Sequence, residues 1–493
     1  MKDDVRVVLA SNRGPISFVK TEAGFDTKRG AGGLSGALDP VARTLGDRAV
    51  WIAAATSDTD REALSAGAAE DLREQLGYHV FLIDIPTRMY AQYYDVVSNR
   101  MLWFANHCLW DELGIKEFGK EELAAWDAAY EPVNERFAQA IAEVADPTSL
   151  VLLQDYHLAA APRYLRALLP NQTIFHFIHS SFCGPEAGLQ RLPRPLPQRT
   201  IEGLLGADLI GFHVDPWTHN FLECCERIGA DVDWADGFVR HDGRKSWVRS
   251  YPIPIDAEEI RQRSADAEAQ NWAARFKKAP GDLLLVRADR TEPSKNIVRG
   301  FQAYEQLLDR RADLRERVHF VACLYPSRQS MSEYRAYTET IETTVSRINN
   351  RYPGAIELFL KDDFDRTIGA LLTYDALLVN PIMDGMNLVA KEGPAVNQAD
   401  GVLVLSQGAG AYAQLGSDAV CIDDPLDIQE TSRAIETALD MPAAERGRMA
   451  KSLRGLAEGS KPSDWIDAQI ADLLEVRDGG RPLTAAAPHP SGR

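Results

Sequence analysis

The sequence predicts an α/β protein with two doubly wound domains that face each other across a cleft. Short, continuously apolar runs alternate with longer amphipathic stretches, which is typical of parallel strands covered by helices on both faces. This alternation comes in two series, separated by a proline-containing segment at 251–256. The length of 493 residues agrees, because about 150 residues per domain allow two or three domains.

The first series predicts a domain at 1–252. Its clearest helix is expected at 121–145, where apolar residues recur at three- and four-residue spacing. Strands are expected at 5–10, 50–55, 79–84, 150–154, 173–178 and 208–212.

The second series predicts a domain at 253–461. It follows YPIPID (251–256), whose two prolines favour a stiff, extended connector. A long helical pattern occupies 330–352. Strands are expected at 283–288, 318–324, 355–360, 376–380 and 401–406.

The C-terminal end predicts a helix and then a tail. Residues 462–477 have a helical pattern, and we expect this helix to pack back on the N-terminal domain. Residues 478–493 are rich in Gly, Pro and Ala without an apolar period, so we expect them to be disordered.

The charge balance excludes several classes of partner. With 54 Lys and Arg against 72 Asp and Glu, the net charge of −18 disfavours binding to nucleic acid or to an anionic membrane surface. No apolar run approaches the roughly 18 residues of a membrane span. The start, MKDDVRVVLASN, lacks the apolar core of a signal peptide, so we expect a cytoplasmic protein.

The cysteines predict reduced thiols. None of the six forms a CxxC pair, and their number is too small for a disulfide framework in a chain of this length. They are Cys108, Cys183, Cys224, Cys225, Cys323 and Cys421.

Ligands of open parallel sheets bind beyond the carboxyl ends of the strands, so residues that follow strands are the candidates for chemistry. SNRGP (11–15) follows the first strand, and RGAGGLSGAL (29–38) then opens a helical pattern. Its backbone N–H groups suit a phosphate or a sugar hydroxyl, or its glycines simply permit a tight turn. The dinucleotide fingerprint fails at Ser35, and no GK[ST] of a nucleotide-triphosphate loop follows.

A pair of cations follows the first strand of the second domain, in RADRTEPSKN (287–296). Arg290 and Lys295 are five residues apart in a strand-to-helix loop. Converging there, they would neutralise a diphosphate; the alternative is two solvated surface cations.

Two carboxylates flank a predicted helix start in NPIMDGMNLVAKEGP (380–394). Asp384 comes first, and the N–H groups of residues 385–388 would face an anion at the positive end of the helix dipole. Glu392 lies about two helical turns further on, where it would reach another part of one ligand. The alternative is an N-cap Asp and a surface Glu.

Three further polar residues follow strands of the first domain. Asp155 and His157 follow 150–154, and His179 follows 173–178; a lone His of this kind is more often structural. The DTD at 58–60 resembles a metal-binding pair, but we interpret it as a helix cap with acids in the first turn. No HExxH or paired CxxC is present, so no metal site is predicted.

Together, these segments resemble the trehalose-6-phosphate synthases, retaining glycosyltransferases of family 20, and in particular actinobacterial members. The resemblance runs from residue 11 to the helix near 470. It implies two Rossmann-like domains that face a cleft, the GT-B fold. The most specific stretches are YYDVVSNRMLWF (93–104), QDYHL (154–158), RTEPSKN (290–296), YPSRQ (325–329) and DGMNLVAKE (384–392).

The resemblance implies an acceptor site for glucose 6-phosphate in the N-terminal domain. Arg13 matches the arginine that holds the acceptor phosphate, and Asp155 matches an acid that binds acceptor hydroxyls. The other residues of the family's acceptor-phosphate pocket are matched in this chain by Tyr94, Trp103 and Arg328.

It likewise implies a nucleotide-sugar site on the C-terminal domain. Arg290 and Lys295 match the cations on the donor diphosphate, and Asp384 matches the acid on the donor sugar hydroxyls. Gly33 and His179 match residues beside the donor, and Glu392 matches the carboxylate that grips the ribose. The expected backbone cradle consists of Gly385, Met386, Asn387, Leu388 and Val389.

The implied reaction needs neither cofactor nor metal. Fixed cations and helix N–H groups stabilise the charge that develops on the leaving diphosphate. No pair of carboxylates suggests the nucleophile and acid of a retaining hydrolase. The implied partners are therefore a nucleoside diphosphate glucose and glucose 6-phosphate, and association into a homo-oligomer is left open.

Two departures from the family put the donor or the product in question. Many members have HIPFP where this chain has HSSFC (179–183), and both prolines are lost. Met383 stands where an arginine often precedes DGMN.

The donor base is predicted from LKDDF (360–364), which occupies the family's base loop. Asp362 or Asp363 could accept hydrogen bonds from guanine N1–H and its N2 amine, which uracil lacks. Some actinobacterial relatives with stretches similar to RTEPSKN and KDDF use GDP-glucose. We therefore expect GDP-glucose rather than UDP-glucose, with Asp362 as the donor-binding residue.

Three other functions compete with this interpretation. HSSFC favours a relative that couples a cyclitol or another non-glucose donor to a sugar phosphate in secondary metabolism. A catalytically silent sugar-phosphate regulator would be expected to lack Arg290, Lys295 or Asp384, and all three are present. A dehydrogenase is disfavoured by the failed glycine fingerprint.

Overall fold

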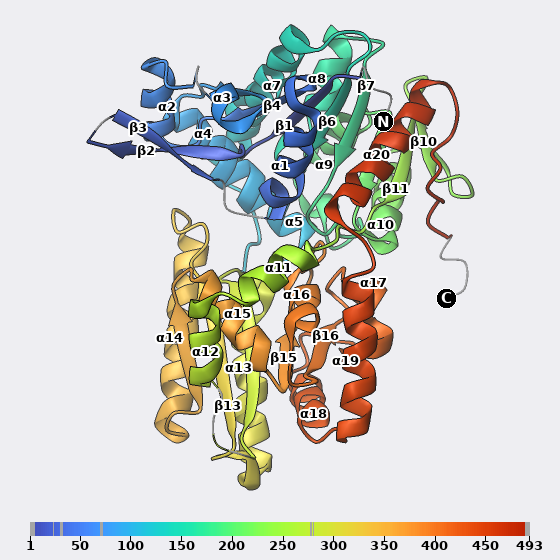
Figure 1. The fold of residues 1–493 in the computed structure, drawn as a ribbon. Coiled ribbons are helices and arrows are strands. Elements are labelled where there is room, and N and C mark those ends of the chain that lie inside the picture. Colours follow the sequence, from blue (N-terminus) through green and yellow to red (C-terminus); the bar gives the residue numbers. More distant parts are fainter. Residues whose placement is uncertain are drawn as a thin grey trace. The chain divides into compact units, whose positions relative to one another are not determined.

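The protein is described here from a computed structural model that covers residues 5–22, 24–29, 33–69, 72–276, 279 and 281–488. The chain forms two compact units (Figure 1). The N-terminal unit is Met1–Pro252 with Pro462–Arg493, and the C-terminal unit is Ile253–Lys461. Both are α/β, and each has a doubly wound sheet, as the sequence predicts.

The N-terminal unit is built on a nine-stranded sheet. Its first seven strands in spatial order are mutually parallel, and the last two are added antiparallel at one edge. The central strands are apolar and buried over their whole length, which fits a sheet covered on both faces. The spatial order is β5 (His79–Ile83), β4 (Ala49–Ala54), β1 (Val7–Ser11), β6 (Leu150–Gln154), β7 (Thr173–Phe177), β8 (Leu209–Phe212), β11 (Arg244–Ser250), β10 (Phe238–His241) and β9 (Asp231–Asp233).

A two-stranded hairpin of β2 (Ile16–Thr21) and β3 (Gly24–Arg29) lies outside this sheet. The helix expected at 121–145 forms as α6 (Lys120–Ala125), a π-helical turn η3 (Trp126–Tyr130) and α7 (Glu131–Val144). The remaining helices of the unit are α1 (Gly33–Leu45), α2 (Asp58–Ser65), α3 (Leu72–Leu76), α4 (Thr87–Ala91), the π-helix η2 (Gln92–Trp103), α5 (Phe104–Asn106), α8 (Ala161–Leu168), α9 (Leu196–Leu204), α10 (Asp215–Arg227) and α20 (Pro462–Arg477), with short 3-10 turns at Gly46–Arg48, Tyr156–Leu158 and Leu189–Arg191.

The C-terminal helix α20 and the segment after it are fixed within the N-terminal unit. Trp465 Nε1 donates to the carbonyl of Tyr251 at 3.0 Å, and Tyr251 Oη donates to Asp472 at 2.7 Å. The backbone N–H groups of Leu483 and Thr484 donate to the same Asp472 carboxylate. Residues 478–488 therefore differ from the disordered tail expected at 478–493, and 489–493 lie outside the described residues.

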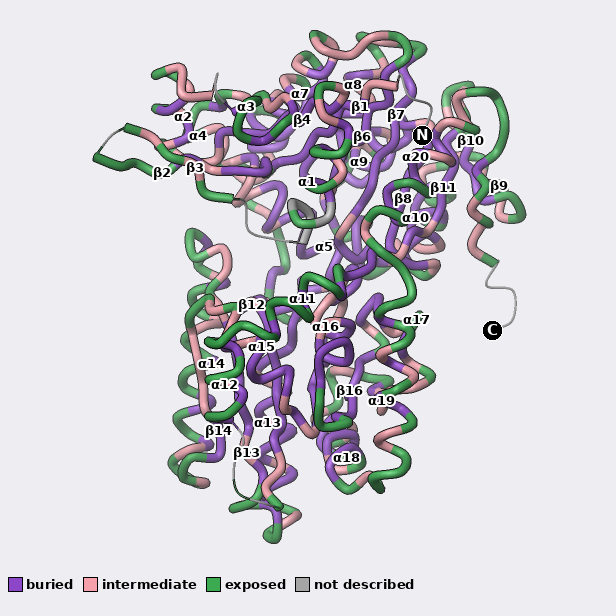
Figure 2. The backbone as a smooth tube through the Cα atoms, viewed as in Figure 1, coloured by how far each residue is buried: buried purple, intermediate pink, exposed green. Residues whose placement is uncertain are grey.

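The C-terminal unit is built on a six-stranded sheet whose strands all pair in parallel. The buried residues concentrate in the strands and on the faces of the helices that pack against them (Figure 2). The spatial order is β14 (Ile356–Leu360), β13 (Val318–Tyr325), β12 (Leu283–Arg290), β15 (Ala376–Val379), β16 (Val402–Ser406) and β17 (Val420–Ile422).

Helices cover this sheet on both sides, as expected for a doubly wound unit. They are α11 (Ala257–Ser264), α12 (Ala267–Phe276), α13 (Ile297–Arg310), α14 (Ser332–Arg351), α15 (Phe364–Thr373), α16 (Val389–Val396), α17 (Tyr412–Leu415), α18 (Ile428–Leu439) and α19 (Ala443–Ala457), with 3-10 turns at Pro293–Lys295, Ala312–Leu314 and Gly416–Asp418. In neither unit does a described helix have both the length and the apolar character needed to cross a membrane.

Two cysteines form a disulfide, so the prediction that all six are reduced is wrong. Cys108, just after α5, is bonded to Cys183 in the loop after β7, across 75 residues of sequence. The other four cysteines are free thiols. The physical reason for the error is that the bond joins two loops which only the folded sheet brings together.

Candidate functional site

The carboxyl ends of β6 and β7 bring two of the predicted residues into contact. Asp155 follows β6 in a left-handed conformation, with φ of 71°. Its carboxylate accepts a hydrogen bond from the backbone N–H of His179 at 3.2 Å and lies 3.6 Å from His157 Nδ1. The His179 ring shares a 2.9 Å hydrogen bond with the side chain of Gln154. The strand ends thus form one hydrogen-bonded cluster, as the position after parallel strands predicts.

Asp155 and His179 differ in their protonation near neutral pH. Burial would raise the pKa of Asp155, but the hydrogen bond and charge of His157 and the charge of His179 hold it well below its ordinary range. Burial lowers the pKa of His179 to about 4, against the attraction of Asp155. Near pH 7 the cluster therefore offers an anionic carboxylate and a neutral imidazole, both suited to hydroxyl groups.

A row of aromatic rings connects this cluster to Arg13. The Arg13 guanidinium donates to Tyr94 Oη at 3.1 Å, and its side chain is exposed. The Tyr94 ring stacks on His157 at 5.6 Å, and the next ring along, Tyr156, lies 4.1 Å from His157 and 5.7 Å from Trp103. Arg13, Tyr94 and Trp103 therefore lie along one continuous row of side-chain contacts.

The sequence interpretation missed one member of this row. Tyr90 stacks on Tyr94 at 5.6 Å and accepts a hydrogen bond from Asn12 at 3.2 Å. The only sequence signal was its place three residues before YYDVVSNRMLWF. The predicted glycine loop is only partly described: Gly33 begins α1, whereas Gly30 and Gly32 lie outside the described residues.

In the C-terminal unit, the ends of β12 and β15 bring together the predicted diphosphate and sugar residues. Arg290 ends β12, and its side chain is 39% exposed. Lys295 is buried and forms an ion pair with Asp384. The Asp384 carboxylate also accepts from Asn387 Nδ2 at 3.0 Å. The arrangement places two cations and one carboxylate around the start of the DGMN loop.

That loop precedes the helix rather than forming its first turns. The sequence predicts helical turns directly after Asp384, but α16 begins at Val389. Asn387 has a left-handed backbone, with φ of 67°, which interrupts the helix. The positive end of α16 is still directed toward Gly385, Met386, Asn387 and Leu388.

Two glycines after β16 hold this loop by backbone contacts that the sequence interpretation did not identify. Asp384 N donates to the carbonyl of Gly408 at 2.9 Å, and Gly410 N donates to the carbonyl of Asp384 at 3.1 Å. A Cβ at Gly408 would lie 2.1 Å from the carbonyl oxygen of Ile382, and one at Gly410 would lie 2.0 Å from that of Gly385. Only glycine fits at either position.

Glu392 and the base-loop aspartates have distinct surroundings. Burial raises the pKa of Glu392, in α16, to about 7. Asp363 is the N-cap of α15 and accepts from Arg366 N at 3.0 Å, so its side chain serves the helix. Asp362, the predicted base contact, is exposed at the end of β14.

Arg328 lies in the C-terminal unit, near Arg290. Its guanidinium donates to Glu292 at 3.2 Å and to Tyr334 Oη at 2.8 Å. Glu292, which the sequence interpretation passed over, also lies 3.1 Å from Arg290. Its only sequence signal is its position in RTEPSKN, between two predicted cations.

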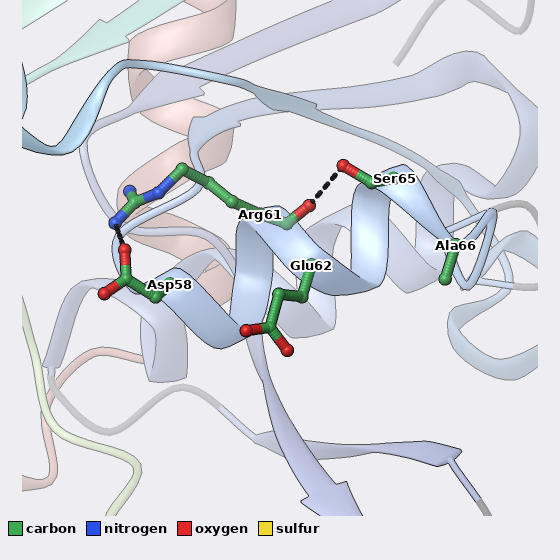
Figure 3. A pocket seen from close by; sticks show the side chains of 5 residues that line it. All are labelled: Asp58, Arg61, Glu62, Ser65 and Ala66. Carbon is green, nitrogen blue, oxygen red and sulfur yellow. Dashed lines mark hydrogen bonds and ion pairs between the residues drawn. The ribbon is translucent and has the colours of Figure 1, made fainter.

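The DTD segment forms a helix cap, as predicted. Ser57 is the N-cap of α2, and it forms a reciprocal capping box with Asp60. A surface pocket along α2 is lined by Asp58, Arg61, Glu62, Ser65 and Ala66, and in it Asp58 points to Arg61 (Figure 3). None of these five is a predicted site residue.

Over the described ranges, no group of three or more His, Cys, Asp or Glu is arranged to hold a metal ion.

Known proteins are similar to this chain over most of its length. Residues 5–475 match the sequence model of Glycosyltransferase family 20. The chain is 32% identical over 501 residues to a trehalose-6-phosphate synthase of Mycobacterium sp. (strain KMS), and the match covers 97% of each chain.

Two solved structures are similar throughout. One is a UDP-forming α,α-trehalose-phosphate synthase from Burkholderia xenovorans in complex with glucose-6-phosphate, with a TM-score of 0.78, 25% identity and coverage of 95% of this chain and 100% of that one. The other, from E. coli, is bound with UDP-2-fluoro glucose, with a TM-score of 0.79, 25% identity and coverage of 95% and 98%.

Proposed function

Since the chain belongs to glycosyltransferase family 20, we propose that it transfers glucose from a nucleoside diphosphate glucose to glucose 6-phosphate. The product would be α,α-trehalose 6-phosphate, formed with retention at the anomeric carbon. The observation that carries the proposal is the ion pair between the buried Lys295 and the half-buried Asp384, beside Arg290, because it combines diphosphate cations with a sugar-binding carboxylate.

The donor diphosphate is assigned to the cations of the C-terminal unit. Arg290 and Lys295 would stabilise the charge that develops on the leaving phosphate, aided by the N-terminus of α16. Both stay protonated, because nearby carboxylates raise the pKa of each despite burial. Lys295 and Asp384 form an ion pair, so a bound donor would redistribute their contacts, Lys295 toward the phosphate and Asp384 toward the sugar hydroxyls.

The rest of the donor is assigned to neighbouring groups. Asp384 and the backbone of residues 385–389 would hold the glucose, and Glu392 the ribose hydroxyls. Gly33 would lie against the donor. For the base we propose guanine, with Asp362 as the acceptor of its N–H groups, because Asp363 is already used as a helix cap.

The acceptor is assigned chiefly to the aromatic row of the N-terminal unit. Arg13, Tyr94 and Trp103 would bind the phosphate of glucose 6-phosphate and cover its ring, and Arg328 keeps its proposed role toward the same phosphate. Asp155, which is anionic, would accept hydrogen bonds from acceptor hydroxyls.

In the proposed reaction, the bond from the anomeric carbon to the phosphate oxygen breaks as a bond to an acceptor hydroxyl oxygen forms on the same face. The hydroxyl proton passes to the leaving phosphate oxygen. His179, neutral near pH 7, would hydrogen-bond the donor sugar without adding positive charge. The protein therefore contributes positioning and electrostatic stabilisation, and we propose that it acts in the cytoplasm.

A second candidate has a specific observation behind it, namely the loop after β7. Ser180 and Ser181 hydrogen-bond to Asn106 at 3.1 and 2.8 Å, and Cys183 is bonded to Cys108. This loop differs from the proline-containing one of many relatives, which favours a different donor, such as an activated cyclitol, on the same phosphate acceptor.

A donor–acceptor matrix tests both candidates. GDP-glucose, UDP-glucose and ADP-glucose are offered with and without glucose 6-phosphate, and nucleoside diphosphate release and product mass are measured. We expect release that requires glucose 6-phosphate, a disaccharide phosphate, and the highest turnover with GDP-glucose. Equal turnover with GDP- and UDP-glucose would remove the role of Asp362. Binding of glucose 6-phosphate without release from any donor would favour the second candidate.

A further inference from the structure

Glu292 is a buried carboxylate between the arginines of the C-terminal unit. It follows β12, and its side chain is 0% exposed. One of its oxygens, Oε1, lies 3.1 Å from Arg290 Nη1 and 3.2 Å from Arg328 Nη1, and it accepts from Ser327 Oγ at 3.0 Å. Three donors from two different strand ends thus converge on a single oxygen.

The carboxylate is ionised near neutral pH. Burial would raise its pKa, but Arg290, Arg328, Lys295 and the Ser327 hydroxyl together lower it to about 2. An anion at this position offsets the repulsion between two guanidinium groups that both contact it. Its second oxygen, Oε2, is buried and has no hydrogen-bond partner in the described part of the chain. The Glu292 carboxylate is therefore stabilised more by the charges of the surrounding cations than by hydrogen bonds.

The two arginines are fixed to different degrees. Arg328 is 7% exposed and is held on a second side by Tyr334 Oη at 2.8 Å. Arg290 is 39% exposed, so its guanidinium has both a buried contact to Glu292 and an open side for a ligand. A shift of Glu292 would therefore reorient Arg290 more than Arg328.

We propose that Glu292 is a positioning residue, which orients Arg290 for the leaving diphosphate and, through its charge, keeps the free diphosphate product from binding too tightly. This rests on the proposed function, because the ligand of Arg290 is taken to be a nucleoside diphosphate. The second effect follows from Coulomb's law, since removing an anion beside two cations strengthens their attraction for any other anion.

The decisive variant is Glu292→Gln, which keeps the shape and removes the charge. We expect kcat to fall about tenfold to a hundredfold, because a misoriented arginine stabilises the transition state less. We also expect the Kd of free GDP and of free UDP, measured by calorimetry on the full chain, to fall by about threefold to tenfold, because the variant loses one negative charge beside the two arginines. A residue that only supports the fold would not combine slower turnover with tighter product binding.

Two further variants serve as controls. Glu305→Gln removes another mostly buried carboxylate of the same unit, which accepts from Arg347 at 2.5 and 2.7 Å. It is expected to change Tm but neither kcat nor the diphosphate Kd. Glu292→Asp keeps the charge but shortens the side chain, so the diphosphate Kd should return to the wild-type value while kcat stays at least threefold low.

Contrary outcomes are equally defined. Wild-type kcat and Kd in Glu292→Gln, or weaker diphosphate binding together with a lower Tm, would assign Glu292 to the scaffold alone. Should Glu292→Gln fail to fold, Glu292→Asp decides, and a wild-type kcat in that variant contradicts the proposal. If the wild-type protein transfers no glucose, the proposed function fails, while the comparison of diphosphate Kd values still decides the effect of the Glu292 charge.

Discussion

The two units have the same type of fold but build their candidate sites from opposite kinds of side chain. In the N-terminal unit, Tyr94, Tyr156 and Trp103 line up behind a single exposed arginine, and the carboxylate of Asp155 lies beside a neutral histidine. In the C-terminal unit, the partly exposed Arg290 and the buried Lys295 are paired with the carboxylates of Glu292 and Asp384, and Arg328 contacts the same Glu292.

This difference matches the chemistry of the two proposed substrates. Rings, hydroxyls and one guanidinium suit a sugar with a single phosphate. Two cations held by carboxylates suit a diphosphate whose negative charge grows during the reaction. A common fold thus serves either ligand, because the residues after the strands decide which ligand binds.

The largest expected effect is the loss of turnover when a cation of the C-terminal unit is removed. Arg290→Ala should lower kcat about 10²–10³-fold, since one donor to the developing charge is lost. Its Tm should also fall, because the buried Glu292 carboxylate loses one of the two guanidinium groups that contact it. Steady-state kinetics with the preferred donor measure this, with Arg317→Ala, an exposed arginine bonded to the Gly281 carbonyl, as the control. A rate near that of the wild type would remove Arg290 from the leaving-group site.

Cutting the disulfide of the N-terminal unit should act on stability. Cys108→Ser frees the loop after β7 from α5, and the loss of a crosslink over a long loop costs about 2–4 kcal/mol in the free energy of unfolding. Urea titration with and without a reductant measures it. The urea midpoint of the wild-type protein should fall when reductant is added, and that of the variant should not change. A wild-type midpoint that is the same with and without reductant would contradict the presence of the disulfide.

A methyl group at Gly408 should disturb the Asp384 loop. Gly408→Ala places a Cβ 2.1 Å from a backbone oxygen, so the loop must move. We expect the KM of the donor to rise at least about tenfold, as in the loss of a charged hydrogen bond. Gly455→Ala, in α19 with nothing within 4 Å, is the control and should gain about 0.5–1 kcal/mol in stability. Normal donor KM in Gly408→Ala would show that the loop tolerates displacement.

A smaller effect is expected from a substitution in the aromatic row of the N-terminal unit, which tests its role in acceptor binding. Tyr94→Phe removes the hydroxyl that accepts from Arg13 but keeps the ring stacked on His157. One hydrogen bond of about 0.5–1.5 kcal/mol corresponds to a rise of about twofold to tenfold in the KM of glucose 6-phosphate. The KM of the donor should not change. A rise in donor KM instead would reverse the assignment of the two units.

The smallest expected effect depends on pH. Because burial raises the pKa of Glu392 to about 7, the carboxylate gains a proton as the pH falls from 8 to 6 and then accepts ribose hydrogen bonds less well. The KM of the donor should therefore rise a few-fold over this range. His179, with a pKa of about 4, stays neutral throughout. Glu392→Gln should flatten the profile, and an unchanged slope would assign it to another group.

The sequence predicted most of what local patterns encode. Continuous apolar runs predicted the positions of β1, β6, β7 and β12. Asp155 and His179 follow their strands in the structure, whereas Arg290, expected in the loop after the strand, is the last residue of β12. Their chemical types suited the contacts observed, because strand ends in parallel sheets collect polar residues at one edge.

Contacts between distant segments could not be predicted in this way. The bond between Cys108 and Cys183 and the backbone packing of Gly408 on Ile382 depend on which loops the sheets bring together. Glu292 looked like one acid in a charged loop, since only the fold brings Arg328 to it. The β2–β3 hairpin, half exposed, lacks the apolar run that identified the other strands.

The central claim is that the charged unit binds the donor and the aromatic unit binds the acceptor. Calorimetric titration of GDP alone and of glucose 6-phosphate alone into Arg290→Ala and Arg13→Ala tests it most directly. We predict that Arg290→Ala loses affinity for GDP and keeps it for glucose 6-phosphate, and that Arg13→Ala does the reverse. Loss of glucose 6-phosphate binding in Arg290→Ala together with normal GDP binding would contradict the account.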